Sequence, residues 1–131
     1  MANAIYPLYK QALLDASTDV DINDGTVKVA LSTAAYNSAH QYYSSVSAST
    51  VGTPQTINNT TVTNGLFDGD DVTYTAVTGS QVTALIIYID TGSAATSRLV
   101  AFIDTGVTNL PVTPNGGNIS ITWNASGIFQ L

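Results

Sequence analysis

The N-terminal segment, residues 1–16, carries apolar side chains at helical spacing. They recur at i, i+3, i+4, i+7 and i+8, at Ile5, Leu8, Tyr9, Ala12 and Leu13. Because Pro7 fits only the first turn of a helix, we predict a helix that begins near Tyr6 or Pro7 and ends by Asp15. A helix this short is unstable alone, so its apolar stripe has to dock on its own sheet or on a neighbouring molecule.

After this segment the period of the pattern changes to two. Apolar and polar residues alternate over 27–31, 72–76 and 119–123, which predicts strands with one face in water. Residues 84–89 and 99–103 are apolar at nearly every position. These two runs predict central strands, or strands with one face hidden by another body.

Turn signals separate the predicted strands. They are Asn64-Gly65, Asp68-Gly69, Thr78-Gly79, Asp90-Thr91-Gly92, Asp104-Thr105-Gly106 and Pro114-Asn115-Gly116-Gly117. Short strands at roughly 10 to 15 residue spacing with such turns are typical of antiparallel sandwiches and barrels. We therefore predict a mainly β fold, a single domain over residues 1–131, forming an antiparallel β-sandwich or barrel with one short N-terminal helix.

Residues 32–61 lack a clear period. The stretch is rich in Ser, Ala, Thr, Tyr and Asn. Long irregular connections in compact domains usually bind something or are ordered by something. We predict a surface arm or long polar loop, which can contain one or two short strands.

Charge is scarce in this chain. Three basic and nine acidic residues, all of the latter aspartate, make up 9% of the sequence and give a net charge of −6, whereas soluble domains carry about 25% charged residues. The shortage of Lys and Arg argues against nucleic acid and anionic membrane surfaces as partners. There is no cysteine and no run of apolar residues long enough for a signal peptide or membrane span. We expect synthesis in a cytoplasm.

The triplet Asp90-Thr91-Gly92 follows an apolar run and resembles the catalytic segment of aspartic proteases. Those enzymes need two carboxylates that share one proton. A second triplet begins at Asp104, so close in sequence that the two triplets should lie at opposite ends of one hairpin. One Asp90 from each chain of a homodimer is the remaining catalytic arrangement. The alternative is a carboxylate that caps the turn after its strand, and we predict no enzyme.

Two further aspartate clusters suggest calcium. The segment 19–25 begins like an EF-hand loop, but Gly25 is at the wrong position and the chain has no glutamate. Asp68, Asp70 and Asp71 form a weaker candidate oxygen site, and solvated turn aspartates are the simpler interpretation. His40 stands alone, without a recognisable triad. We therefore expect no resident metal and no cofactor.

Uncharged polar and aromatic residues are abundant, a composition typical of interfaces. The predicted contact residues lie in the helical segment and in the 32–61 stretch: Tyr6, Leu8, Tyr9, Tyr36, Tyr42 and Tyr43. A second interpretation is a carbohydrate-binding β-sandwich with Tyr42, Tyr43 or Trp123 as a stacking platform.

Three stretches together resemble a family of small virion proteins of tailed bacteriophages. They are VTNGLFDGDDVTY at 62–74, TSRLVAFID at 96–104 and LPVTPNGGNI at 110–119, and Ile5-Tyr6-Pro7 and Gly127-Ile128-Phe129 also fit. The resemblance implies a structural component of the particle and brings no catalytic residues.

Within a virion, we expect a capsid decoration or cement protein. It would be made in the host cytoplasm, bind the outer surface of the head and bridge subunits of the major capsid protein, as a homo-oligomer, trimer or dimer. A tail, neck or baseplate component is the alternative in the same setting. A homodimeric aspartic protease and a carbohydrate-binding sandwich are the alternatives from other classes.

Overall fold

The computed structural model describes residues 3–107 and 110–131 of the chain. Its elements are, in chain order, β1 (Ala4–Ile5), α1 (Pro7–Leu14), β2 (Thr26–Ser32), the 3-10 helices η1 (Tyr43–Ser45) and η2 (Ser47–Ser49), β3 (Thr50–Thr56), β4 (Thr61–Thr63), β5 (Leu66–Asp68), β6 (Val72–Tyr74), β7 (Ala84–Asp90), β8 (Arg98–Ile103), β9 (Ile119–Ile121) and β10 (Phe129–Gln130). The helix agrees with the predicted one, and Pro7 occupies its first turn, where no backbone N–H is needed.

The main sheet has five antiparallel strands in the order β1-β8-β7-β2-β3. Strands β2 and β7 pair along seven residues, from Thr26 opposite Asp90 to Ser32 opposite Ala84. The two apolar runs form β7 and β8, and their side chains are buried on both faces of the sheet except at Asp90. The prediction of central strands is confirmed.

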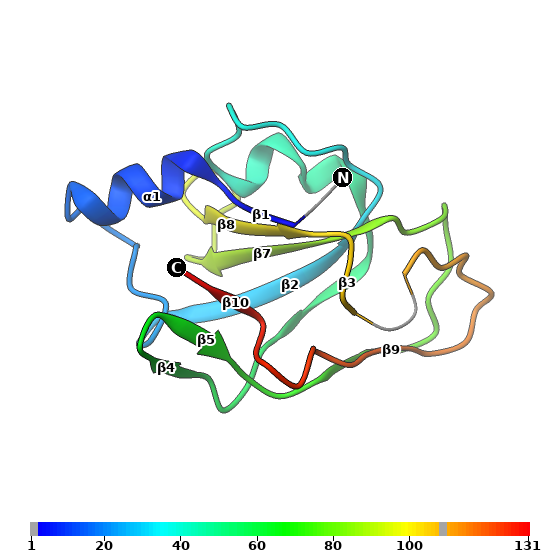
Figure 1. The fold of residues 1–131 in the computed structure, drawn as a ribbon. Helices are drawn as coiled ribbons and strands as arrows, with labels where there is room; N and C mark the ends of the chain where they lie inside the picture. The colour runs from blue at the N-terminus through cyan, green and yellow to red at the C-terminus, as the bar shows by residue number, and fades with distance from the viewer. Residues whose placement is uncertain (1–2, 108–109) are drawn as a thin grey trace.

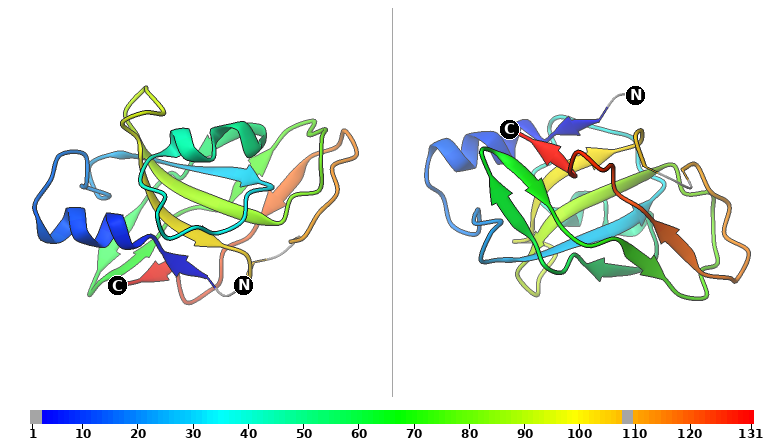
Figure 2. Two further views of the ribbon diagram at one scale, coloured as in Figure 1. Left: turned by 90° about the horizontal axis from the view of Figure 1, so that it is seen from above. Right: turned by 60° about the horizontal axis from the view of Figure 1, so that its bottom comes forward.

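A second layer lies below the main sheet (Figure 1). It consists of the three-stranded sheet β10-β5-β4 and the two-stranded sheet β6-β9, which cross in front of the main sheet in the right-hand view of Figure 2. The buried rings of Phe67 and Tyr74 belong to this layer, and the Tyr74 hydroxyl donates a hydrogen bond of 2.7 Å to the Val29 carbonyl of β2. The fold is mainly β and sandwich-like, which confirms the first of the two predicted architectures.

The hairpin of β4 and β5 follows directly from its turn residues. Asn64 and Gly65 have φ values of 53° and 79°, and the two-residue turn that joins antiparallel strands in a type I′ hairpin requires positive φ at both positions. Thr63 therefore pairs with Leu66, and Val62 pairs with Phe67. This turn was predicted from the Asn-Gly dipeptide.

The upper face of the main sheet is covered by the chain itself. Helix α1 and the segment 33–49 lie above the sheet in Figure 1. The Tyr43 ring stacks on Tyr88 with centroids 4.0 Å apart and planes at 10°, and the Val46 side chain is buried. This cover explains why β7 is apolar on both faces, since no second molecule is required to bury it.

The stretch 32–61 therefore does not project as a free surface arm, and it begins with an irregular loop over 33–41, as the alternative prediction of a long loop expects. Its first part packs on the sheet through buried Tyr43 and Val46, and its second part forms β3, a seven-residue edge strand paired with β2. The pattern hid β3 because Gly52 and Pro54 interrupt it, and both residues are unfavourable inside a strand. Gly52 has a φ of 70°, and the pairing register with β2 shifts at this point.

Two other strand predictions need correction. Strand β2 has no continuous wet face, because Ala30 is fully buried and Lys28 is half-buried beneath the cover. The predicted strand 72–76 ends at Tyr74, since Ala76 has a φ of 49° and leaves the extended region. Within β6 and β9 the predicted alternation of buried and exposed residues is confirmed.

Candidate functional site

Three of the predicted contact residues are not available to a partner. The side chains of Tyr6, Tyr9 and Tyr43 are buried within the chain's own core. The Tyr9 hydroxyl donates to the Val20 carbonyl at 2.8 Å, and burial, helped by the charge of Asp21, raises the Tyr9 pKa to about 12. Burial likewise raises the pKa of Tyr6 and Tyr43. The helical spacing of the sequence correctly predicted the apolar stripe. This stripe docks on the sheet of its own chain and not on a partner.

The other three predicted contact residues are half-buried. Tyr36 lies between Tyr6 and Phe102, with ring centroids 5.5 and 5.6 Å away. Tyr42 forms an isolated antiparallel bridge with Arg98, whose guanidinium carbon lies 5.4 Å from the centre of the Tyr42 ring. Leu8 lies on α1 at the edge of the contact with the sheet. These six residues thus build the cover of the main sheet.

Asp90 ends β7, as the turn interpretation of its triplet predicts. Its carboxylate forms an ion pair of 3.1 Å with Lys28 of β2 and accepts a hydrogen bond of 3.1 Å from the Gly92 backbone N–H. Partial burial raises the Asp90 pKa, but the Gly92 N–H, Lys28 and Ser97 lower it more, so the net shift is downward. An aspartic protease dyad instead requires one carboxyl that holds its proton.

The second triplet lies far from the first. Asp104 follows the last residue of β8, and the register of the β7–β8 pair places Arg98, at the other end of β8, beside Ile89. The Asp104 backbone N–H donates to the side-chain oxygen of Asn3 at 2.8 Å. The expectation that the triplets occupy opposite ends of one hairpin is confirmed.

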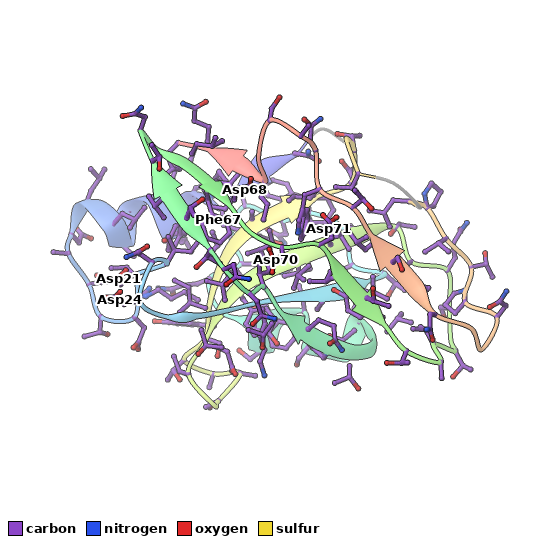
Figure 3. All side chains as sticks on the ribbon, turned by 90° about the horizontal axis from the view of Figure 1, so that it is seen from below. Asp21, Asp24, Phe67, Asp68, Asp70 and Asp71 are labelled. Carbon is purple, nitrogen blue, oxygen red and sulfur yellow. The ribbon has the colours of Figure 1, made fainter. Side chains whose placement is uncertain are left out.

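Asp68 is the last residue of β5, Asp70 and Asp71 lie in the short link to β6, and the three side chains occupy separate positions (Figure 3). Asp68 accepts from the Gly69 N–H, Asp70 accepts from the Asn59 amide at 2.7 Å, and Asp71 accepts from the Trp123 N–H at 2.9 Å. Within residues 3–107 and 110–131, no group of three or more carboxylate or imidazole side chains is arranged to hold a metal ion. Each carboxylate instead stabilises the loop conformation around it.

The proposed stacking platform does not form. Trp123 is 6% exposed, and its indole N–H donates to the Asp70 carbonyl at 2.9 Å. Tyr43 is stacked inside the core and Tyr42 is half-buried beneath Arg98. The three rings therefore present no flat exposed aromatic surface of the kind that stacks against a sugar.

His40 lies in the loop between β2 and η1. In the part of the chain that the structure describes, the buried His40 Nδ1 has no hydrogen-bond partner, so the carboxylate–imidazole contact of a catalytic triad is not assembled. Over the same residues, the only α-helix is the eight-residue α1, and no helix reaches the length and apolar character that crossing a bilayer demands.

The outer surface of the second layer is built from small uncharged side chains. We call Thr73, Thr75, Ser120 and Thr122 the threonine face; all four are exposed. Thr73 lies opposite Ser120 in the register of β6 and β9, with their hydroxyl oxygens 3.4 Å apart. Sequence alternation marked both strands as half-exposed, but only the pairing of strands 47 residues apart in sequence brings these hydroxyls together.

Strand β4 forms an edge of the same layer. It pairs with β5 on one side only, all three of its residues are exposed, and Val62 remains 46% exposed. No charged residue, proline or bulge interrupts it, although these are the usual features that keep an edge strand from pairing with another chain.

No protein-family model matches this chain, and no curated protein matches it in sequence.

Proposed function

We propose that the protein is a structural virion component, a decoration or cement protein that binds the outside of a tailed-phage head and bridges neighbouring major capsid subunits. The threonine face carries this proposal. Thr73 and Ser120 are exposed and paired across β6 and β9, Thr75 and Thr122 follow closely after these strands, and the centres of protein interfaces are depleted of charge. The resemblance of three long stretches of the sequence to phage virion proteins supports the choice of partner.

The physical demands on such a protein match this surface. A rigid two-stranded platform loses little conformational entropy when it docks, because its hydroxyl-bearing side chains are short and already ordered on strands. Each copy needs only modest affinity when it spans two subunits, since the second contact is made at high effective concentration. All four residues of the face are uncharged, and the exposed Asp71, immediately before β6, places a carboxylate at its border.

The open edge of β4 supports the proposed homo-oligomer. Two copies related by a two-fold axis can pair their β4 edges antiparallel, with Val62 buried between them, because such a contact is self-complementary. A trimer around a shell axis is the other closed arrangement that we consider. A tail, neck or baseplate position would use the same neutral surface with a different partner.

The decisive measurement is the number of copies per particle, by quantitative mass spectrometry of purified virions. A decoration protein is present in hundreds of copies, on the order of the major capsid protein itself, and heads that lack it should burst or leak at a lower temperature. A copy number near that of a tail fitting would assign the protein to the tail or neck. Absence from the virion would refute the proposal.

Substitutions that introduce a charge test the role of the threonine face. We expect Thr73→Lys and Thr75→Lys to weaken binding of the purified protein to heads that lack it, because a lysine ammonium would have to be desolvated in the contact. Ser44→Lys is the matched control. Ser44 is exposed on η1, on the opposite side of the main sheet, so this variant should bind normally. Equal binding by all three variants would exclude the threonine face as the contact.

A further inference from the structure

A small cavity lies between α1 and the beginning of β8. Its volume is about 80 Å³, room for a few water molecules or one small anion. The polar residues that line it are Gln11 and Asp15 of the helical segment, Ser17 after it, Gln41 and Arg98. None of the sites described above uses this cavity.

Arg98 is the unusual member of this set. The residue as a whole is 8% exposed, and buried guanidinium groups are normally paired with a carboxylate. Here the Nε–H donates to the Thr18 carbonyl at 2.8 Å, and the guanidinium lies over the Tyr42 ring. Within the described residues, no carboxylate lies within 4.0 Å of the Arg98 guanidinium. The ion pair that these residues do form joins Lys28 to Asp90 and does not involve Arg98.

The two contacts of Arg98 fix the guanidinium and leave its terminal nitrogens without a protein acceptor among the described residues. A guanidinium presents a planar fork of N–H donors that matches the two oxygens of a carboxylate. The amides of Gln11 and Gln41 and the hydroxyl of Ser17 line the same cavity and can donate further hydrogen bonds. The site is thus a cation held by two contacts, with neutral donors and the Asp15 carboxylate around it.

We propose that this cavity is a binding site for one carboxylate group, held by the Arg98 guanidinium. The carboxylate belongs either to a free small acid or to an acidic side chain of a bound protein. Asp15 lines the same cavity without pairing with Arg98, and its negative charge opposes an incoming anion. The native site is therefore tuned to weak, reversible binding.

The test is an NMR titration that follows the side-chain Nε–H signal of Arg98 in the full chain. Sodium acetate should shift this signal along a saturable curve, whereas sodium chloride at equal ionic strength should not. Arg98→Lys keeps the charge but loses the fork, and we expect it to weaken acetate binding about tenfold, observed through the backbone amides of Gln41 and Ser17. A chloride shift as large as that of acetate, or an unchanged affinity in Arg98→Lys, would overturn the proposal.

Asp15→Asn provides a second test that does not depend on the stability of the Arg98 variant. Asp15 is exposed at the end of α1, so this change should fold normally. Because it removes the opposing charge, we expect acetate to bind several-fold more tightly, and weaker binding would contradict the site. Titration with a blocked peptide that contains one glutamate separates the two sources of carboxylate. Binding tighter than that of acetate indicates a protein side chain, and equal or weaker binding indicates a free acid.

Discussion

At the residue scale, Tyr74 links the two layers of the fold through one hydroxyl group. Its ring is 1% exposed and its hydroxyl donates to the Val29 carbonyl of the main sheet. We expect Tyr74→Phe to lower the free energy of unfolding by about 1 kcal/mol, the net contribution of a buried hydrogen bond. Tyr42→Phe, which alters a half-buried hydroxyl with only a 3.4 Å contact to Gln41, should change it by less. Urea unfolding of the two variants measures both effects, and equal effects would contradict this role for Tyr74.

Asp90 has a small, pH-dependent role in stability. Its pKa in the folded protein lies below the ordinary value of 3.8, so its contribution is fully present above pH of about 4 and is lost as pH falls through the folded pKa. The pair with Lys28 is partly exposed, and we expect Asp90→Asn to cost up to about 1 kcal/mol at neutral pH. The difference between the variant and the native protein should vanish in acid. A difference that grows as the pH falls would disprove this assignment.

The sequence predicts single residues best where chemistry is local. The turn role of Asp90 and the type I′ turn at Asn64-Gly65 depend on neighbouring atoms and are found by inspection of a few residues. Burial of Tyr6 and Tyr43 depends on segments that are distant in sequence, so the same aromatic residues were wrongly predicted to be exposed contacts. The cavity around Arg98 was missed for the same reason, because its lining comes from α1, the 41–42 region and β8.

At the element scale, α1 is held by one face only. Ala12 is 4% exposed and faces the fold, whereas Leu14 is 89% exposed two residues later. We expect Ala12→Lys to lower the unfolding free energy by about 2 kcal/mol or more, because it places a cation at a buried position on the cavity that the Arg98 guanidinium also lines. Leu14→Lys should change it by less than about 0.5 kcal/mol. Thermal or urea unfolding distinguishes them, and similar losses would show that the helix is not docked as described.

Elements were predictable in proportion to the regularity of their pattern. The helix, β7 and β8 agree with their apolar periods, and the two strands that carry the threonine face show the predicted alternation. Strand β3 was hidden because its stability comes from pairing with β2 and not from its own composition, which includes a glycine and a proline. Tertiary pairing overrides weak local preference in such strands.

At the scale of the whole molecule, buried tyrosines determine the alkaline limit of stability. Burial raises the pKa of Tyr6, Tyr9, Tyr74 and Tyr88 in the folded state above the ordinary value of 10.0. Above that pH the unfolded chain loses these protons first, so the contribution of these tyrosines to the free energy of unfolding is constant below pH of about 10 and falls as pH rises further. Urea unfolding at increasing pH measures this slope. Tyr9→Phe should reduce the slope, and a stability that is flat through this range would refute the burial of these rings.

The β3 edge of the main sheet is poorly suited to pairing with a further strand. Pro54 has no backbone N–H, and Gly52 with its shifted register bends β3 away from a regular ladder. A strand from another molecule that added here would lack a hydrogen bond and meet an irregular partner. Concentrated solutions of this protein should therefore resist fibril growth at the β3 edge, and Pro54→Thr is the substitution that would open that route.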